Sequence, residues 1–143
     1  MKSIVVWMGA VLLSACASAP RVASDAVPAN AAPVSGAWTG TYTCLQGETG
    51  LTLSLAGAAN GLVEGTFLFY PTPSNPNAAT GKFIVRGWHY SDRSLVLSPG
   101  AWLERPDGYR TVSLRGRLDA DERTFTGVIP ECLNTRFSIQ RSD

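Results

Sequence analysis

Apolar and polar residues alternate over several short stretches of the chain. Leu51, Leu53 and Leu55 are separated by single polar residues, and Phe137 and Ile139 stand in the same relation near the C-terminus. Successive side chains of a strand point to opposite faces, so this alternation predicts strands with one buried and one solvated face. No stretch long enough for a helix shows a convincing 3.6-residue period of apolar residues without an interrupting glycine or proline. The pattern therefore predicts a domain built from β-strands.

Turn-forming residues separate these runs at regular intervals, as at Ala59-Asn60-Gly61 and Asp107-Gly108. Short strands in close succession favour an all-β fold, and we predict a small antiparallel β-barrel of about eight strands in up-and-down order. A two-sheet β-sandwich built from the same strands is the alternative. The predicted strands cover residues 37–45, 50–56, 62–70, 82–90, 94–98, 109–118, 124–130 and 135–141.

The first residues have the layout of a secretory signal peptide. Lys2 precedes an apolar run from Ile4 to Leu13, which at about 1.5 Å per residue spans only about half of a bilayer core. The run ends in Leu13-Ser14-Ala15-Cys16, which resembles the lipobox of bacterial lipoproteins. We therefore predict a lipoprotein signal peptide over residues 1–15. An ordinary signal peptide with a chance cysteine is the alternative.

The resemblance to a lipobox implies that Cys16 is lipidated and becomes the first residue of the mature chain. Acyl chains on this residue would anchor the protein to a membrane. Ala17 rather than Asp follows Cys16, which implies the outer membrane, with the domain facing the periplasm or the cell surface. Residues 16–35 are rich in Ala, Pro and Ser, so we expect a disordered tether there and the barrel at 36–143.

Lipidation of Cys16 leaves Cys44 and Cys132 as a pair in an oxidising compartment, where a disulfide is expected. Cys44 lies on the first predicted strand and Cys132 just before the last. The first and last strands are neighbours in a closed barrel, so the disulfide would connect the two strands that close it, at the barrel seam. Two separate buried thiols are the alternative.

The composition excludes several classes of function. A formal charge of +1 argues against a nucleic-acid partner, and one His with three Cys supplies few ligands for a metal. We expect no cofactor. His89 is the single histidine, and no nucleophile motif accompanies it, so we predict that the protein is not an enzyme. A small hydrolase that uses His89 is the less favoured alternative.

Two longer connections, residues 71–80 and 99–108, should open at the same end of an up-and-down barrel. Trp102 lies in the second, beside Glu104 and Arg105, and prolines stiffen both. Tryptophan, tyrosine and arginine together are typical of the residues that dominate protein interfaces. A competing interpretation makes Trp102 a plug of the barrel core. The predicted binding residues are Trp88, Trp102, Glu104, Arg105, Tyr109, Asn75 and Asn77.

The predicted lipoprotein layout, with Tyr42-Thr43-Cys44 on an early strand and a second cysteine near the end, resembles the membrane-bound inhibitors of c-type lysozyme. That family enters the lysozyme cleft through a Ser-Gly-x-x-Tyr loop. This chain lacks the loop; the nearest candidates are Asn75–Gly81 and Gly108-Tyr109. Gly36-Ala37-Trp38 is similar to the Gly-x-Trp that opens lipocalin-like barrels, where the Trp packs across the barrel base.

We therefore predict a binding module whose partner is a protein, with lysozyme among the candidates, or cell-wall glycan. A structural component of an envelope assembly is the alternative.

Overall fold

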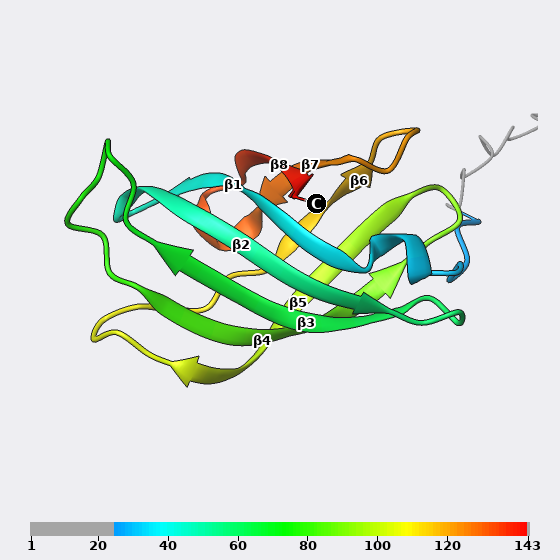
Figure 1. The fold of residues 1–143 in the computed structure, drawn as a ribbon, viewed down its shortest axis with the longest axis horizontal. Helices are drawn as coiled ribbons and strands as arrows, with labels where there is room; N and C mark the ends of the chain where they lie inside the picture. The colour runs from blue at the N-terminus through cyan, green and yellow to red at the C-terminus, as the bar shows by residue number, and fades with distance from the viewer. Residues whose placement is uncertain (1–24, 143) are drawn as a thin grey trace, which may run out of the picture.

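Eight antiparallel strands close into a barrel in the computed structural model, which describes residues 25–142 (Figure 1). Each strand pairs with the next one along the chain, and β8 pairs with β1 to complete the ring. The predicted up-and-down barrel is confirmed, and the sandwich is excluded. The strands are β1 Gly36–Cys44, β2 Gly47–Gly57, β3 Leu62–Tyr70, β4 Gly81–His89, β5 Ser94–Glu104, β6 Leu114–Leu118, β7 Thr124–Ile129 and β8 Thr135–Ser142.

Two strands differ most from their predicted bounds, and β2 begins at Gly47 rather than at 50. β5 continues to Glu104 rather than ending at 98, because its pairing with β4 continues beyond the register shifts around Phe83 and Val85, up to Lys82 opposite Glu104. Such an irregularity accommodates Pro99, which lacks a backbone donor. β6 begins at Leu114 rather than at 109. Ser113 is held instead by Glu131, which accepts hydrogen bonds from Ser113 N at 2.9 Å and Oγ at 2.7 Å.

Aromatic rings and leucines from the inward-facing positions fill the barrel. Phe67 stacks on Phe83 with ring centroids 4.6 Å apart, and Phe125 meets Phe137 edge to face at 4.9 Å. This packing resembles that of other protein interiors. The largest fully buried side chains are Trp38, Phe67, Phe69, Phe83, Phe125, Leu51, Leu53, Leu95, Leu97, Leu114, Leu118 and Ile129.

The disulfide joins the first strand to the segment before the last. Cys44 and Cys132 are bonded, with Cα atoms 5.0 Å apart, and Cys132 ends the short 3-10 helix η2, Pro130–Cys132. Beside it, the Thr135 hydroxyl donates to Thr43 O at 2.8 Å. The predicted Cys44–Cys132 bridge at the barrel seam is confirmed.

The segment before β1 packs on the barrel, which differs from the tether predicted there. Ala31 and Val34 are fully buried, and the 3-10 helix η1, Ala32–Val34, lies against β2. Ala29 N donates to His89 O and Ala31 N to Ala58 O, each at 2.9 Å. The prediction of a disordered tether is therefore wrong for the last part of this segment, because its apolar side chains and backbone groups find partners at the barrel end.

We call the end of the barrel that this N-terminal segment covers the closed end. Trp38 is fully buried there and donates from Nε1 to Val34 O at 2.9 Å. The Arg141 guanidinium lies 4.5 Å from the centroid of the Trp38 rings and donates to Ser35 O at 2.6 Å. The last strand is thereby tied to the segment that precedes the first.

The predicted signal peptide and Cys16 lie outside the described residues. Within residues 25–142, no helix is long and apolar enough to cross a membrane.

Candidate functional site

The opposite end of the barrel, which we call the open end, gathers the β1–β2, β3–β4, β5–β6 and β7–β8 connections (Figure 1, left). Ala79 N in the β3–β4 connection donates to the Tyr109 hydroxyl in the β5–β6 connection at 3.0 Å. The two connections predicted to share one end therefore do so, although β5 takes up the first half of the second.

A hollow of about 720 Å³ lies at the open end. We call it the mouth pocket. It is built from the end of β1, the turn that follows, the β5–β6 connection and η2, so segments far apart in the sequence meet around it. Its lining residues are Tyr42, Cys44, Leu45, Gln46, Gly108, Tyr109, Arg110, Thr111, Val112 and Glu131.

The Tyr42 hydroxyl belongs to the buried side of the mouth pocket. The residue is only 5% exposed, and Gln46 Nε2 donates to its hydroxyl and to Thr49 Oγ1, each at 3.3 Å. Burial, and then the neighbouring Tyr109, raise the pKa of Tyr42 far above its ordinary value, against a lowering by the Gln46 hydrogen bond. The phenol therefore stays protonated and keeps a hydrogen to donate.

Glu131 supplies a fixed carboxylate at the edge of the same pocket. Both its oxygens accept hydrogen bonds from Ser113, one from the backbone and one from the hydroxyl. Partial burial raises the pKa of Glu131, but the Ser113 hydrogen bonds and the nearby Arg115 lower it by more, so the pKa lies below its usual value. The group is ionised at neutral pH.

Trp102 does not stand on a free loop as predicted. It lies in β5 opposite Phe83, is half-buried, and meets the rings of Phe69 and Phe83 edge to face at 6.1 and 5.4 Å. Arg105 lies 5.8 Å from its ring centroid, and Glu104, which ends the strand, is exposed. The packing of Trp102 supports the competing interpretation, in which it plugs the core.

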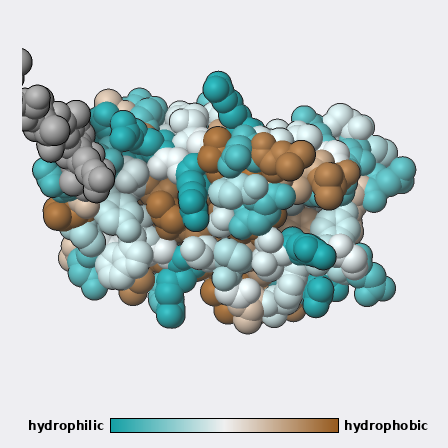
Figure 2. Space-filling model, turned by 180° about the vertical axis from the view of Figure 1, so that it is seen from behind, coloured by the Kyte–Doolittle hydropathy of each residue, from teal (hydrophilic) through white to brown (hydrophobic). Residues whose placement is uncertain are grey.

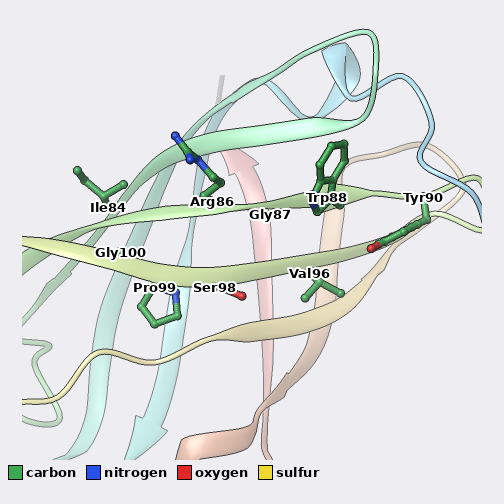
Figure 3. A pocket seen from close by; sticks show the side chains of 9 residues that line it. All are labelled: Ile84, Arg86, Gly87, Trp88, Tyr90, Val96, Ser98, Pro99 and Gly100. Carbon is green, nitrogen blue, oxygen red and sulfur yellow. The ribbon is translucent and has the colours of Figure 1, made fainter.

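Trp88 is separated from the other predicted residues. It faces outward on β4, close to the closed end of the barrel. Trp88 is five residues from Phe83, the residue paired with Trp102, so Trp88 and Trp102 are about 17 Å apart along the strand direction. It lines a separate shallow hollow of about 450 Å³ on the outer face of β4 and β5, together with Ile84, Val96 and Pro99 (Figure 3). Trp88 and Trp102 therefore do not form one site.

The two predicted asparagines lie in the β3–β4 connection with different surroundings. Asn75 Nδ2 donates to Gln46 O at 2.7 Å and Glu48 O at 3.0 Å, which fastens this connection to the β1–β2 hairpin. Asn77 is exposed. Asn75 is therefore a structural clamp of the open end, and Asn77 is available at its surface.

Two leucines that the sequence analysis did not single out are exposed at the open end. Leu45 is 95% exposed and Leu133 is 87% exposed, and each directly follows a disulfide cysteine. Consecutive Cα atoms are about 3.8 Å apart, so the Leu45 and Leu133 Cα atoms lie at most about 13 Å from each other. In the sequence, each is a single apolar residue in or next to a predicted turn. Single exposed apolar residues are common on protein surfaces, so this feature does not identify a binding site.

The face of the barrel opposite to the view of Figure 1 is mixed in character. It carries separate apolar patches among hydrophilic side chains (Figure 2).

His89 lies far from the mouth pocket, at the closed end. It is 5% exposed; its Nδ1 lies 3.0 Å from Asn30 O, and its Nε2 has no hydrogen-bond partner among the described residues. This environment ties the imidazole to the packed N-terminal segment. Among residues 25–142, no group of three His, Cys, Asp or Glu side chains is arranged to hold a metal.

Comparisons of the chain with protein-family models, with curated proteins and with solved structures find no match.

Proposed function

We propose that this protein is an outer-membrane lipoprotein, anchored through Cys16, whose barrel is a non-enzymatic binding module for a partner in the cell envelope. The predicted layout resembles the membrane-bound inhibitors of c-type lysozyme, so a lysozyme-type protein is one candidate partner. Cell-wall glycan is the other. The barrel recognises its partner through the open end and carries out no reaction of its own.

The difference between the two barrel ends is the observation that carries this proposal. The closed end is filled by Ala31, Val34 and Trp38. The open end has the mouth pocket and the exposed Leu45 and Leu133. Barrel mouths are common places for binding sites, because loops there can vary while the scaffold stays rigid.

The start of the described chain supports the orientation that this function needs. Val27 N donates to Ser91 Oγ at 3.2 Å, and Pro28 forms a bridge with Tyr90, so the chain enters the barrel at the closed end. An anchor at Cys16 would therefore attach at the closed end. The open end would face away from the anchor and towards a partner.

Location is tested in the cells that make the protein. Globomycin, which blocks lipoprotein signal peptidase, should cause the unprocessed precursor to accumulate, and Cys16→Ser should release the protein from membranes or trap it as precursor. A mature form with an unmodified Cys16 would contradict the anchoring.

Partner binding is tested by capture from envelope extracts, followed by an assay of lysozyme inhibition with the captured and the purified protein. Capture that fails with Leu45→Ser and persists with Val27→Ser would support binding through the open end. Reproducible turnover of a substrate that disappears in His89→Ala would overturn the non-enzymatic class.

A further inference from the structure

The polar side chains of the mouth pocket are held in place by the protein itself. The Gln46 amide is fixed by the Tyr42 and Thr49 hydroxyls, and the Glu131 carboxylate is fixed by Ser113. A ligand that bonds to these groups does not have to order them first, which lowers the entropic cost of binding. The pocket is thus organised before a ligand arrives.

Apolar surfaces lie between these polar groups. The Tyr109 ring stacks parallel to Phe69, with centroids 5.3 Å apart and an interplanar angle of 8°, and its hydroxyl is tied to Ala79 N. These two contacts hold the ring in position. Leu45 and Val112 add aliphatic surface to the same wall.

The charges that line the pocket are balanced. Arg110 is its one cationic lining residue and Glu131 its one anionic lining residue, while Gln46, Thr111 and Tyr42 are uncharged groups that donate and accept hydrogen bonds. This balance favours a neutral ligand that carries many hydroxyl or amide groups over an anionic or a cationic one. Buried rings fill the barrel interior, where Phe67 stacks on Phe83, and this packing disfavours an acyl chain as the ligand.

We propose that the mouth pocket is a saccharide-binding site. Tyr109 stacks on the apolar face of a sugar ring, and Glu131, Gln46 and Arg110 bond to its hydroxyl and amide groups. A volume of about 720 Å³ lies within the range of about 300–1,000 Å³ that is usual for small-molecule sites, so the pocket holds a short glycan segment. This inference rests on the proposed function and gives its partner a chemical class.

The test uses the full chain, purified without sugar-based detergents, and two probes: the trimer of N-acetylglucosamine, and maltotriose. Saturation-transfer NMR should detect protein contact with the ring protons of at least one probe, and titration gives its affinity. Arg110→Ala removes a charged hydrogen-bond donor from the pocket and should weaken binding by about tenfold. Arg136→Ala is the matched control, because Arg136 is exposed on the outer face of β8.

Tyr109→Leu provides a second test, since leucine keeps apolar contact with Phe69 but offers no ring to a sugar. It should reduce saturation transfer while the circular dichroism spectrum stays that of a β-protein. Absence of binding by either probe at millimolar concentration, or equal weakening by Arg110→Ala and Arg136→Ala, would overturn the saccharide site.

The proposed function and this inference fail separately. If Arg110→Ala abolishes capture of a protein from envelope extracts while neither sugar binds, the open end binds a protein. The inference is then wrong and the binding module stands. If a sugar binds but the affinity is unchanged by Arg110→Ala and Tyr109→Leu, the binding lies elsewhere and the site assignment is wrong.

Discussion

At the scale of single residues, the large apolar side chains near the open end divide into a packed aromatic cluster and two exposed leucines. Trp102, Tyr109 and Phe69 form one cluster of rings, in which Phe69 is buried and the other two are half-buried. Leu45 and Leu133, by contrast, contribute almost their whole surface to solvent. Size and hydrophobicity alone do not separate these roles, because both kinds of residue are large and largely apolar and lie near the same end of the barrel.

Trp102→Ala should lower the thermal stability of the domain. The side chain packs edge-on against Phe69 and Phe83 and is half-buried, so its loss should cost about 2 kcal/mol, or about 8 °C in melting temperature. Differential scanning calorimetry measures the shift, with the outward-facing Trp88→Ala as the control. An unchanged melting temperature together with lost partner binding would instead make Trp102 an interface anchor.

Glu131 should make stability depend on pH in the acidic range. Its folded-state pKa lies below the ordinary 4.5, so its contribution is complete above about pH 4.5 and is lost as the pH falls through the folded-state value. Glu131→Gln should therefore lower the melting temperature at pH 7, and the difference from the wild type should shrink as the pH falls below about 4.5 towards 3. Glu104→Gln, at an exposed position, is the control. Equal effects of Glu131→Gln at both pH values would contradict the Ser113 pairing.

At the scale of elements, the alternation of apolar and polar residues predicted the strands. Each strand has one face buried inside the barrel and the other exposed to solvent. β3 and β7 match their predicted positions within a residue. The ends of β5 and β6 could not be predicted this way. They depend on a register shift against β4 and on the Glu131–Ser113 hydrogen bonds, which join residues distant in sequence.

The candidate site was predicted only in part, for a similar reason. Tyr109 and the two connections could be placed at one end from strand order alone. Tyr42, Gln46 and Glu131 join the mouth pocket because closure of the barrel brings β1 beside the segment that leads into β8. Nothing local in the sequence marks them as neighbours.

The disulfide should contribute a large part of the domain's stability. It joins residues 88 apart in sequence, and a loop of that length corresponds to about 4–5 kcal/mol of unfolded-chain entropy. Cys44→Ala/Cys132→Ala should reduce the free energy of unfolding by about that amount in urea titrations. The wild type in dithiothreitol should behave like the double variant. A loss below about 1 kcal/mol in both would show that the β1–β8 pairing is sufficient on its own.

The packed N-terminal segment should behave as part of the domain. A chain that starts at Ala37 lacks Ala31 and Val34 from the closed end and leaves the Trp38 indole without its acceptor. It should lose about 3 kcal/mol relative to a chain that starts at Asp25, and its tryptophan emission should shift to longer wavelength. Equal urea midpoints for the two chains would mean that the segment adds nothing to stability.

At the scale of the whole molecule, the barrel separates two ends that differ in structure. Arg141, Trp38 and the packed N-terminal segment hold one end closed, where the described chain begins. The connections around the mouth pocket form the other end. In the proposed function, the closed end carries the anchor and the open end carries the partner.

The most direct test of binding through the open end compares matched variants at the two ends in one quantitative capture experiment from envelope extracts. Leu45→Ser/Arg110→Ala alters the open end, and Val27→Ser/Arg93→Ala makes the same kinds of change at the closed end, where Val27 is 60% exposed. Capture of the partner should fall by about tenfold or more with the first pair and stay within about twofold with the second. Equal capture by both pairs, or a loss confined to the closed-end pair, would contradict binding through the open end.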